Sequence, residues 1–545
     1  MIMKCRYLMM GLSLCCMSVF AQTHYDAANY SERELNGTAR FVGMGGAMGA
    51  LGADISVMGT NPAGIGLFRG NDFSTSFGFN ANLTSSTAGD MLMKDKSVKA
   101  SFDQMGLVYS MKIGNRTPLR YVNIGFNYHK DRNFNSMMRT GGFLDGSSQT
   151  QQMATMMDGF SNEQIDDIYN YGVKGYEGIE NPYYSNNQYP YLGILGVRTG
   201  LVAVDADNGK KIGWVGDSNA FQGREEGGIH HYDFNVSLNL RDRVYLGMTI
   251  GVDDVRYRRS TYYTEDVYDG EDGGFYELMN DFATDGTGVN FKLGAIFRPI
   301  EDSPFRFGVA VHTPTWFNLT DYYQSYIYSE LEYNFVRTDE DGNEVTDVSG
   351  KPIVDRELVK LEDDTRSNVD GDIVRDYQLK TPWRFNVSAG TVVFGRMAIG
   401  AEYEYAATTS SKLYYYDGYE MADQNSIIKE DLKGVHTAKV GLEFRVLPSL
   451  SLRAGYNYNS SMYRETAYKA LGWNDMRTDV EYNNKFAKNT VTAGLGFAHR
   501  SFYIDVAYKY DTYKSDFYAF SDDNLLPIKV NNDRHQLLFT LGAHF

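Results

Sequence analysis

The stretch that decides the fold is 231-HYDFNVSLNL-RD-RVYLGMTIGVD-253. On both sides of the Arg241-Asp242 pair, apolar and polar residues alternate with a period of two, the pattern of a β-strand with two different faces. Each run has ten residues or more, whereas strands of soluble sandwiches usually have about five or six. About ten residues is the length that a tilted strand needs to cross a bilayer, so the stretch predicts a hairpin of a transmembrane β-barrel.

The same alternation recurs along the chain from Asn71 onward and predicts fourteen strands. Six of the links between them are short, and they alternate strictly with seven longer links. An even number of strands, with tight turns on one side and long loops on the other, is typical of an antiparallel barrel in a bilayer. The expected strands are 72–83, 101–113, 119–130, 230–240, 243–257, 288–298, 304–313, 375–393, 396–408, 435–446, 449–460, 487–498, 501–511 and 534–545.

The first segment, 1-MIMKCRYLMMGLSLCCMSVFA-21, has the layout of a secretory signal peptide. Lys4 and Arg6 form a short basic region, an apolar region follows, and the segment ends on small residues suited to cleavage. A lipoprotein anchor on Cys15 or Cys16 is the alternative. All three cysteines lie in this segment, so we expect the exported chain to lack a disulfide and a cysteine-based metal site.

The charge and hydropathy of the remaining chain exclude several classes of protein. The formal net charge is −17, and loss of Lys4 and Arg6 makes it −19. A strongly acidic chain is a poor candidate for binding nucleic acid or an anionic lipid surface. After residue 21 there is no run of eighteen apolar residues. In a membrane, such a chain must form a closed barrel.

The stretch 534-RHQLLFTLGAHF-545 is a strand whose alternate apolar residues end on an aromatic one. Phe539, Leu541 and Phe545 share one face, which resembles the signal that the assembly machinery of bacterial outer-membrane barrels recognises. An ordinary edge strand is the alternative. With the signal peptide, this pattern predicts a barrel that contacts outer-membrane lipid in a Gram-negative bacterium. The sequence carries no signal for the oligomeric state, and we expect a monomer.

The stretch 37-GTARFVGMGGAMGALGADISVMGTNPAGIGLF-68 precedes the first strand and has a different character. Its glycines disfavour a long helix, and Pro62 disfavours a central strand. A fourteen-stranded barrel has a bore wider than its own side chains fill. We therefore expect residues 22–70 to fold back as a hatch inside a barrel formed by residues 71–545.

At this point the sequence resembles a known family, the long-chain fatty-acid transporters of the outer membrane (FadL/TodX-like). The resemblance rests on an ordered set within about thirty residues: Gly37, Arg40, Gly43, Gly46, Asp54, Asn61, Pro62 and Ala63. It implies passive uptake of a hydrophobic ligand, captured by outer loops, held in a pocket inside the barrel and released sideways through the wall. Lateral release needs a kinked or bulged strand, whose place the sequence does not predict.

The two largest outer loops are expected at 131–229 and 325–372. In the first, four apolar residues recur at helical spacing and are candidates for ligand capture: Met153, Met156, Met157 and Phe160. Flexible methionines suit a promiscuous apolar groove; the alternative is that this stripe packs the loop's own core. Ser161 and Gln164 are spaced as a capping box for the following helix.

The lumen is expected to be polar, with charges paired between strands. Lys439, Arg445 or Lys509 would be available to hold the carboxylate of a fatty acid. No catalytic signature, metal-binding motif or cofactor motif is present, so we expect no enzyme, no cofactor and no metal centre. The alternatives are a porin for polar solutes and, further back, a haemin-binding receptor or surface adhesin that uses the outer loops.

Overall fold

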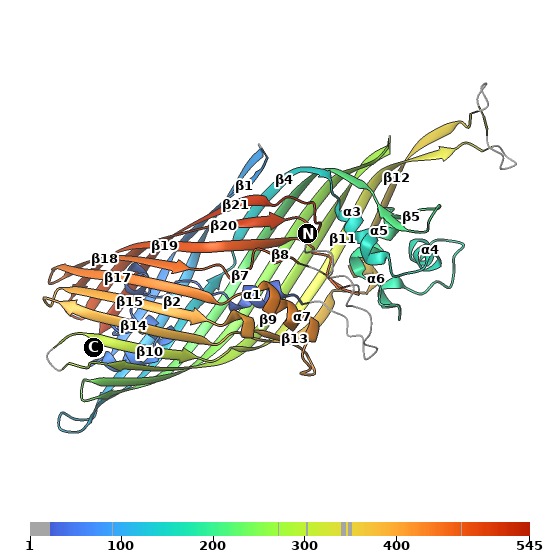
Figure 1. The fold of residues 1–545 in the computed structure, drawn as a ribbon. Coiled ribbons are helices and arrows are strands. Elements are labelled where there is room, and N and C mark those ends of the chain that lie inside the picture. The colour runs from blue at the N-terminus through green and yellow to red at the C-terminus, as the bar shows by residue number, and fades with distance from the viewer. Residues whose placement is uncertain are drawn as a thin grey trace.

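The computed structural model describes residues 22–89, 91–270, 272–300, 303–338, 345–346, 351–469, 471–472 and 474–545. The expected signal peptide, residues 1–21, lies outside the described residues. Within them, fourteen antiparallel strand positions close into one barrel (Figure 1), which confirms the predicted fold class. The ring closes where β1 pairs with β21, with Phe77 opposite Phe539.

Ten of the strand positions are occupied by single strands. These are β1 (Asp72–Ala88), β2 (Met91–Lys112), β7 (Val215–Leu240), β8 (Val244–Asp269), β9 (Asp272–Phe297), β17 (Val435–Leu447), β18 (Leu450–Asn459), β19 (Tyr482–His499), β20 (Phe502–Tyr518) and β21 (Ile528–His544). The other four positions are interrupted along their length. They are β3 (Leu119–Asn133) with β4 (Ser136–Gly146), β10 (Arg306–His312) with β11 (Trp316–Val336), β12 (Val354–Asp364) with β13 (Ile373–Lys380) and β14 (Arg384–Val393), and β15 (Met397–Ala406) with β16 (Lys412–Tyr415).

The barrel is apolar outside and polar inside, the reverse of a soluble domain. On β7, the outward Phe234 and Val236 are 53% and 45% exposed, whereas the inward Asp233 and Ser237 are fully buried. Because neighbouring side chains on a strand point to opposite faces, the alternation of the sequence becomes an alternation between the outside and the lumen.

Two of the links predicted to be long loops are in fact extensions of hairpins. Residues 84–88 and 91–100 extend the ladder of β1 and β2, and residues 258–269 and 272–287 extend that of β8 and β9. The predicted loop 131–229 is also shorter than expected, because residues 136–146 form β4 and residues 215–229 form the start of β7. These segments are rich in Thr, Ser and Tyr, which suit a strand once a partner strand is available.

Helices gather at the end of the barrel opposite the C-terminus (Figure 1). They comprise α3 (Gln149–Met157), α4 (Asn162–Asn170), η4 (Pro182–Tyr184), α5 (Tyr191–Arg198), α6 (Thr365–Asn368), η5 (Thr408–Ser410) and α7 (Ala422–Asp431), and a separate hairpin of β5 (Val202–Val204) and β6 (Lys211–Gly213) accompanies them. One apolar cluster joins α3 and α5 to the barrel interior and includes Met157, Leu195, Tyr276 and Ile327. In the described residues no helix combines the length and the hydropathy required to cross a bilayer.

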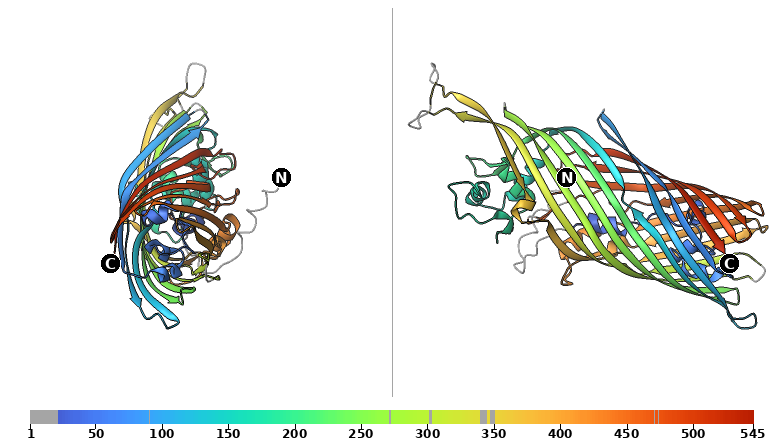
Figure 2. Two further views of the ribbon diagram at one scale, coloured as in Figure 1. Left: turned by 90° about the vertical axis from the view of Figure 1, so that its left-hand side faces the viewer. Right: turned by 180° about the vertical axis from the view of Figure 1, so that it is seen from behind.

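The segment before β1 forms four short helical elements: α1 (His24–Ser31), α2 (Ala39–Gly43), η2 (Ile55–Gly59) and η3 (Pro62–Leu67). The views from three sides agree that these elements lie within the ring of strands (Figures 1 and 2). Tyr30 of α1 donates to the Thr284 hydroxyl of β9 at 2.8 Å. The Ala39 N–H of α2 donates to the Thr540 hydroxyl of β21 at 2.7 Å. The segment therefore contacts wall strands that are far apart in the ring.

Candidate functional site

The polar residues of the glycine-rich segment cap its short helices. Asp54 accepts from the N–H of Ser56 at 3.0 Å, at the start of η2, and from the Thr38 hydroxyl at 2.8 Å. Asn61 accepts from the N–H of Ala63 at 3.2 Å, at the start of η3. The bonds from the Ser56 and Ala63 N–H groups each satisfy a donor that a helix start leaves unpaired. Two residues of the expected hatch motif thus fix the path of the backbone.

Other residues of the motif fasten the segment to the wall. Arg40 forms an ion pair with Glu443 of β17 at 2.9 Å. The Pro62 carbonyl oxygen accepts from the Ser237 hydroxyl of β7 at 2.8 Å. Because these two strands lie on different parts of the ring, the segment is held from opposite directions.

The three glycines of the motif serve turns and close contact. Gly37 and Gly46 have φ values of +140° and +76°, in the region that favours glycine. The carbonyl oxygen of Gly43 accepts from the Thr492 hydroxyl of β19 at 3.1 Å. All eight motif residues lie inside the barrel and contribute to caps, turns or wall contacts.

A row of wall glycines faces this segment, and sequence reasoning missed it. The glycine row consists of Gly390, Gly400, Gly441 and Gly455, each paired directly with the next across β14, β15, β17 and β18. A Cβ on Gly400 would collide with the carbonyl oxygen of Ala47, and one on Gly441 with that of Met44. The row lets the backbone of the N-terminal segment lie directly on the backbone of the wall.

An extended connection links α1 to α2; residues 32–36 are called the strap. The strap runs along the end of β3. The N–H of Glu34 donates to the carbonyl oxygen of Asp131 at 3.0 Å, and its carboxylate accepts from the N–H of Asn133 at 3.4 Å. Arg33 pairs with the carboxylate of Asp131 at 3.4 Å. Lys509 of β20 donates to the Leu35 carbonyl oxygen at 2.8 Å.

The strap lies where two wall strands separate. In the described residues the β2–β3 ladder stops at the pair Gln104–His129. Just beyond it each strand carries one extra residue, Asp103 in β2 and Asp131 in β3, around which the register shifts. β2 then pairs only with β1, and β3 and β4 only with β7. Bulges bend strands and are frequent next to functional sites. We call this separation the fork.

Side chains, rather than a backbone ladder, join the two sides of the fork. The amide of Asn36 in the strap donates to the Asp103 carboxylate and to the Lys130 carbonyl oxygen, both at 3.0 Å. Farther along, Asp95 of β2 pairs with Arg139 of β4 at 2.7 Å. The strap therefore ties both strands together from the lumen side, at the one place that is described where their pairing ends.

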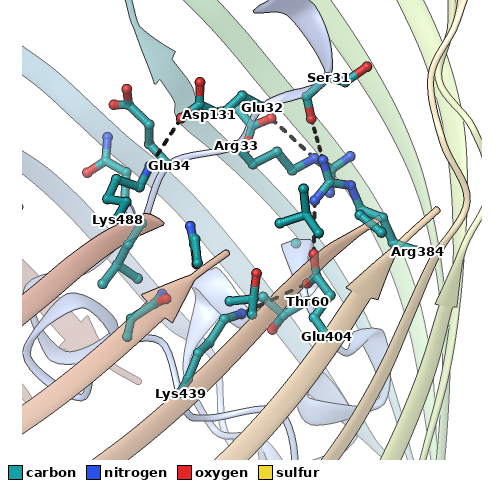
Figure 3. Close-up of a pocket in the computed structure, with 18 of the residues that line it drawn as sticks. Ser31, Glu32, Arg33, Glu34, Thr60, Asp131, Arg384, Glu404, Lys439 and Lys488 are labelled. Carbon is teal, nitrogen blue, oxygen red and sulfur yellow. Dashed lines mark hydrogen bonds and ion pairs between the residues drawn. The ribbon is translucent and has the colours of Figure 1, made fainter. Parts of the chain in front are cut away.

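Two cavities meet at the strap, and both are lined by Glu32, Glu34, Lys485 and Lys488. The first has a volume of about 140 Å³, and its lining adds the charged residues Arg33, Asp131, Arg384, Glu404 and Lys439 (Figure 3). Arg384 bridges the Ser31 carbonyl oxygen and the Glu404 carboxylate. The second has a volume of about 180 Å³. Its lining combines many charged residues with nine aromatic ones, Tyr25, Phe134, Phe221, Tyr257, Phe282, Tyr463, Tyr482, Tyr513 and Phe517.

The two strap glutamates are ionised despite their surroundings. Burial opposes the charge of Glu32, but Arg132, Lys485 and Lys488 outweigh it and hold its pKa well below the usual range. Burial likewise opposes the charge of Glu34, and Arg534, followed by nearby lysines, lowers its pKa. A buried carboxylate surrounded by cations remains charged because the Coulombic attraction exceeds the desolvation cost.

The candidate capture residues lie on and next to α3. Met153 and Met157 are fully buried and pack against Gly196 and Gly193 of α5, while Met156 and Phe160 are partly buried against the same cluster. Ligand capture by these residues stays a prediction. The predicted capping box is confirmed: Ser161 and Gln164 bond reciprocally at the start of α4.

The three candidate cations for a carboxylate have different positions. Lys439 lines the first cavity and bonds to Glu402 at 2.7 Å. Lys509 holds the strap and pairs with Asp511 at 3.4 Å. Arg445 is exposed at the short-turn end of β17, where its N–H donates to the Arg396 carbonyl oxygen. The structure thus keeps only Lys439 and Lys509 inside the barrel.

Of the expected assembly residues, Phe539 and Leu541 lie on the outer face of β21, and Phe545 directly follows that strand. Leu541 and Phe545 are 44% and 69% exposed. Phe539 stacks on Phe77 of β1, with 5.9 Å between ring centroids, at the seam where the barrel closes. Recognition of this face by assembly machinery stays a prediction.

No family model and no curated protein sequence matches the chain. Among solved structures, the crystal structure of a Pseudomonas aeruginosa FadL homologue is similar over 94% of this chain and 99% of its own, with a TM-score of 0.51 and 12% identity. The chain has the fold of this FadL homologue. Two further FadL-like matches are the toluene transporters TodX of P. putida (TM-score 0.46, 11% identity) and TbuX of Ralstonia pickettii (0.44, 13%), each covering 94% of this chain and 99% of the other.

Two parts of this site were not predicted from sequence. The glycine row has a visible signal, because each glycine sits in the middle of an alternating run, as in "AIGAEYEY" and "KVGLEF". The strap also has one, the charged run "ERE" at residues 32–34 before the glycine-rich segment. The fork has none, since a bulge is defined only by the partner strand.

Proposed function

We propose that this chain is an outer-membrane channel of a Gram-negative bacterium that admits hydrophobic small molecules by diffusion. Long-chain fatty acids or similar amphiphiles are the ligand class, residues 22–70 are the hatch, and the fork is the lateral exit. The observation that carries the proposal is the fork itself: a place where two wall strands part and a segment of the N-terminal region ties them together from inside.

The outer surface supports a membrane location. Large apolar side chains point outward from strands around the ring. Five examples are between 45% and 59% exposed: Phe79, Val236, Leu293, Val440 and Leu495. Such a surface is unfavourable in water, since burial of apolar area stabilises by about 25 cal/mol per Å². Lipid chains provide that burial.

The fork explains how a hydrophobic ligand would leave. Transfer of a hydrocarbon chain from an apolar environment back to water costs about 0.8 kcal/mol of free energy per CH₂. An exit through the wall delivers the ligand to the bilayer without that loss. Movement of the strap, which holds Asp103 and Asp131, would separate the strands that have no ladder between them.

A disulfide tests this proposal. We expect Asn36→Cys/Asp103→Cys, oxidised, to block entry of a fluorescent fatty acid into vesicles containing the purified barrel, and reduction to restore it. The control is Val440→Cys/Tyr456→Cys, which crosslinks two residues directly opposed in a continuous ladder. Equal uptake by the oxidised and reduced fork variant would contradict lateral exit at the fork.

A polar-solute channel is the second candidate, favoured by the charged lining of the first cavity. It predicts steady ion conductance in planar bilayers and uptake of sugars or amino acids. The hatch model predicts low conductance, because the N-terminal segment occupies the lumen, and a large increase when residues 37–68 are removed.

A further inference from the structure

Four basic side chains from three parts of the wall converge on the strap. Arg132 comes from β3, Lys485 and Lys488 from β19, and Arg534 from β21. All four line the second cavity, and the two lysines line the first as well. We call these four residues the basic cradle. Its members come from three strands that are far apart in the sequence, and they meet where the two cavities join.

The strap's own carboxylates occupy the basic cradle. Glu32 accepts from Arg132 at 2.7 Å and from Lys485 at 3.1 Å through one oxygen, and from Lys488 at 3.4 Å through the other. Glu34 pairs with Arg534 at 2.5 Å. Both oxygens of Glu32 are thus bound as those of a ligand carboxylate would be.

Withdrawal of the strap would leave the basic cradle with a net positive charge. Its four cations face the two strap carboxylates, and the other carboxylates that act on them are Asp511, which also pairs with Lys509, and Glu225. The side chain of Arg132 is only 6% exposed. A buried cation that loses its partner carries a large desolvation cost, so an anion that takes the place of Glu32 would be favoured when the strap moves.

We propose that the basic cradle is an oxyanion-binding site which Glu32 and Glu34 occupy as internal stand-ins, and that the acidic headgroup of an amphiphile exchanges with them. The headgroup takes over Arg132, Lys485 and Lys488, and its apolar tail lies among the aromatic residues of the second cavity. Exchange removes the charges that hold the strap against β3, so binding of the ligand loosens the tie across the fork. This inference rests on the proposed function.

The experiment compares two probes of equal chain length, hexadecanoate and hexadecan-1-ol, binding to the purified barrel in detergent by calorimetry. Wild type is expected to bind the acid more tightly than the alcohol. Glu32→Gln removes the internal competitor and is expected to raise affinity for the acid about fivefold or more, within the range of coupling between sites, and to leave the alcohol unchanged. Lys485→Gln/Lys488→Gln is expected to abolish the preference for the acid.

Glu443→Gln is the matched control, because it removes a carboxylate that holds Arg40 of the N-terminal segment and leaves the basic cradle intact. If it raises binding of both probes equally while Glu32→Gln raises only the acid, the cradle is confirmed. If the acid and the alcohol bind wild type equally and Glu32→Gln changes neither affinity, the proposal of an oxyanion site at the basic cradle is wrong, and the proposed uptake of hydrophobic molecules is unaffected. If wild type binds neither probe, both the oxyanion site and the proposed function are contradicted.

Discussion

The backbone N–H of Glu34 donates to the carbonyl oxygen of Asp131, the extra residue of the β3 bulge, at 3.0 Å. Because Asp131 is skipped by the β3–β7 register, its carbonyl is available to the lumen. The same residue holds Arg33 through its carboxylate. One bulged residue therefore links the N-terminal segment to the wall at the point where the wall divides.

Deletion of Asp131 is expected to abolish this link. It would make Lys130 and Arg132 neighbours, opposite His230 and Ile229 of β7, and so restore a continuous register. We expect the barrel to fold and uptake of a fluorescent fatty acid to fall about fivefold or more, as for loss of coupling between sites. Asp131→Ala, which retains the bulge, is the control. Unchanged uptake after the deletion would show that the bulge is not required.

A methyl group in the glycine row is expected to displace the N-terminal segment. Gly400→Ala places a Cβ against the Ala47 carbonyl oxygen, and such overpacking costs about 1–3 kcal/mol. Limited proteolysis should then cut residues 37–68 faster, and conductance in planar bilayers should rise. Gly159→Ala is the control, because Gly159 has no atom within 4 Å of the added Cβ. Wild-type protease resistance in Gly400→Ala would show that the glycine row does not hold the N-terminal segment in place.

Asn61→Ala is expected to destabilise η3. The substitution removes both the cap on the Ala63 N–H and the bond to the Ala295 carbonyl oxygen. Loss of an N-cap costs about 1 kcal/mol, which hydrogen exchange at residues 62–67 would report as faster local opening. Asn61→Asp keeps the cap oxygen and should recover most of the protection. No difference between the two variants would mean that the cap does not stabilise η3.

The outer helices are expected to loosen as the pH rises. Burial raises the pKa of Asp475 to about 7, and the Asp475 carbonyl accepts from the N–H of Tyr191 at the start of α5. When the pKa of a carboxyl is higher in the folded state than its unfolded value of about 3.9, the group stabilises the fold. This contribution to the free energy of unfolding is complete at pH values below the unfolded pKa. That contribution declines as the pH rises and is lost through about 7. Hydrogen exchange at α5, corrected for intrinsic rates, should therefore show falling protection between pH 4 and 7.

Asp475→Asn is the matched variant for this prediction. It keeps a neutral side chain of the same shape at every pH, so the protection of α5 should become independent of pH over this range. If wild type and Asp475→Asn show the same pH profile, the ionisation of Asp475 does not control the contact with α5.

The sequence alone determined the barrel, because its signal is local. In residues 231–253 the period of two assigns each side chain to one face of the strand. The alternation of short and long links between such runs indicates antiparallel neighbours. The capping box of Ser161 and Gln164 is equally local. The caps and turns of residues 37–68 also have local signals, since a cap, a turn glycine and a proline act on their immediate neighbours.

The partner strand decided the features that the sequence left open. Residues 84–88, 91–100, 258–269 and 272–287 look like loop residues by themselves and become strands only where a neighbour supplies the hydrogen bonds. Asp103 and Asp131 are ordinary strand residues in sequence, and each is a bulge only in relation to the register of the next strand.

The basic cradle likewise exists only in three dimensions. Arg132 lies hundreds of residues before Lys485, Lys488 and Arg534, and closure of the ring brings all four to Glu32 and Glu34. Local alternation therefore fixed which side chains face the lumen. The curvature and closure of the barrel decided which of them meet, because contact across a lumen depends on how every strand is placed around it.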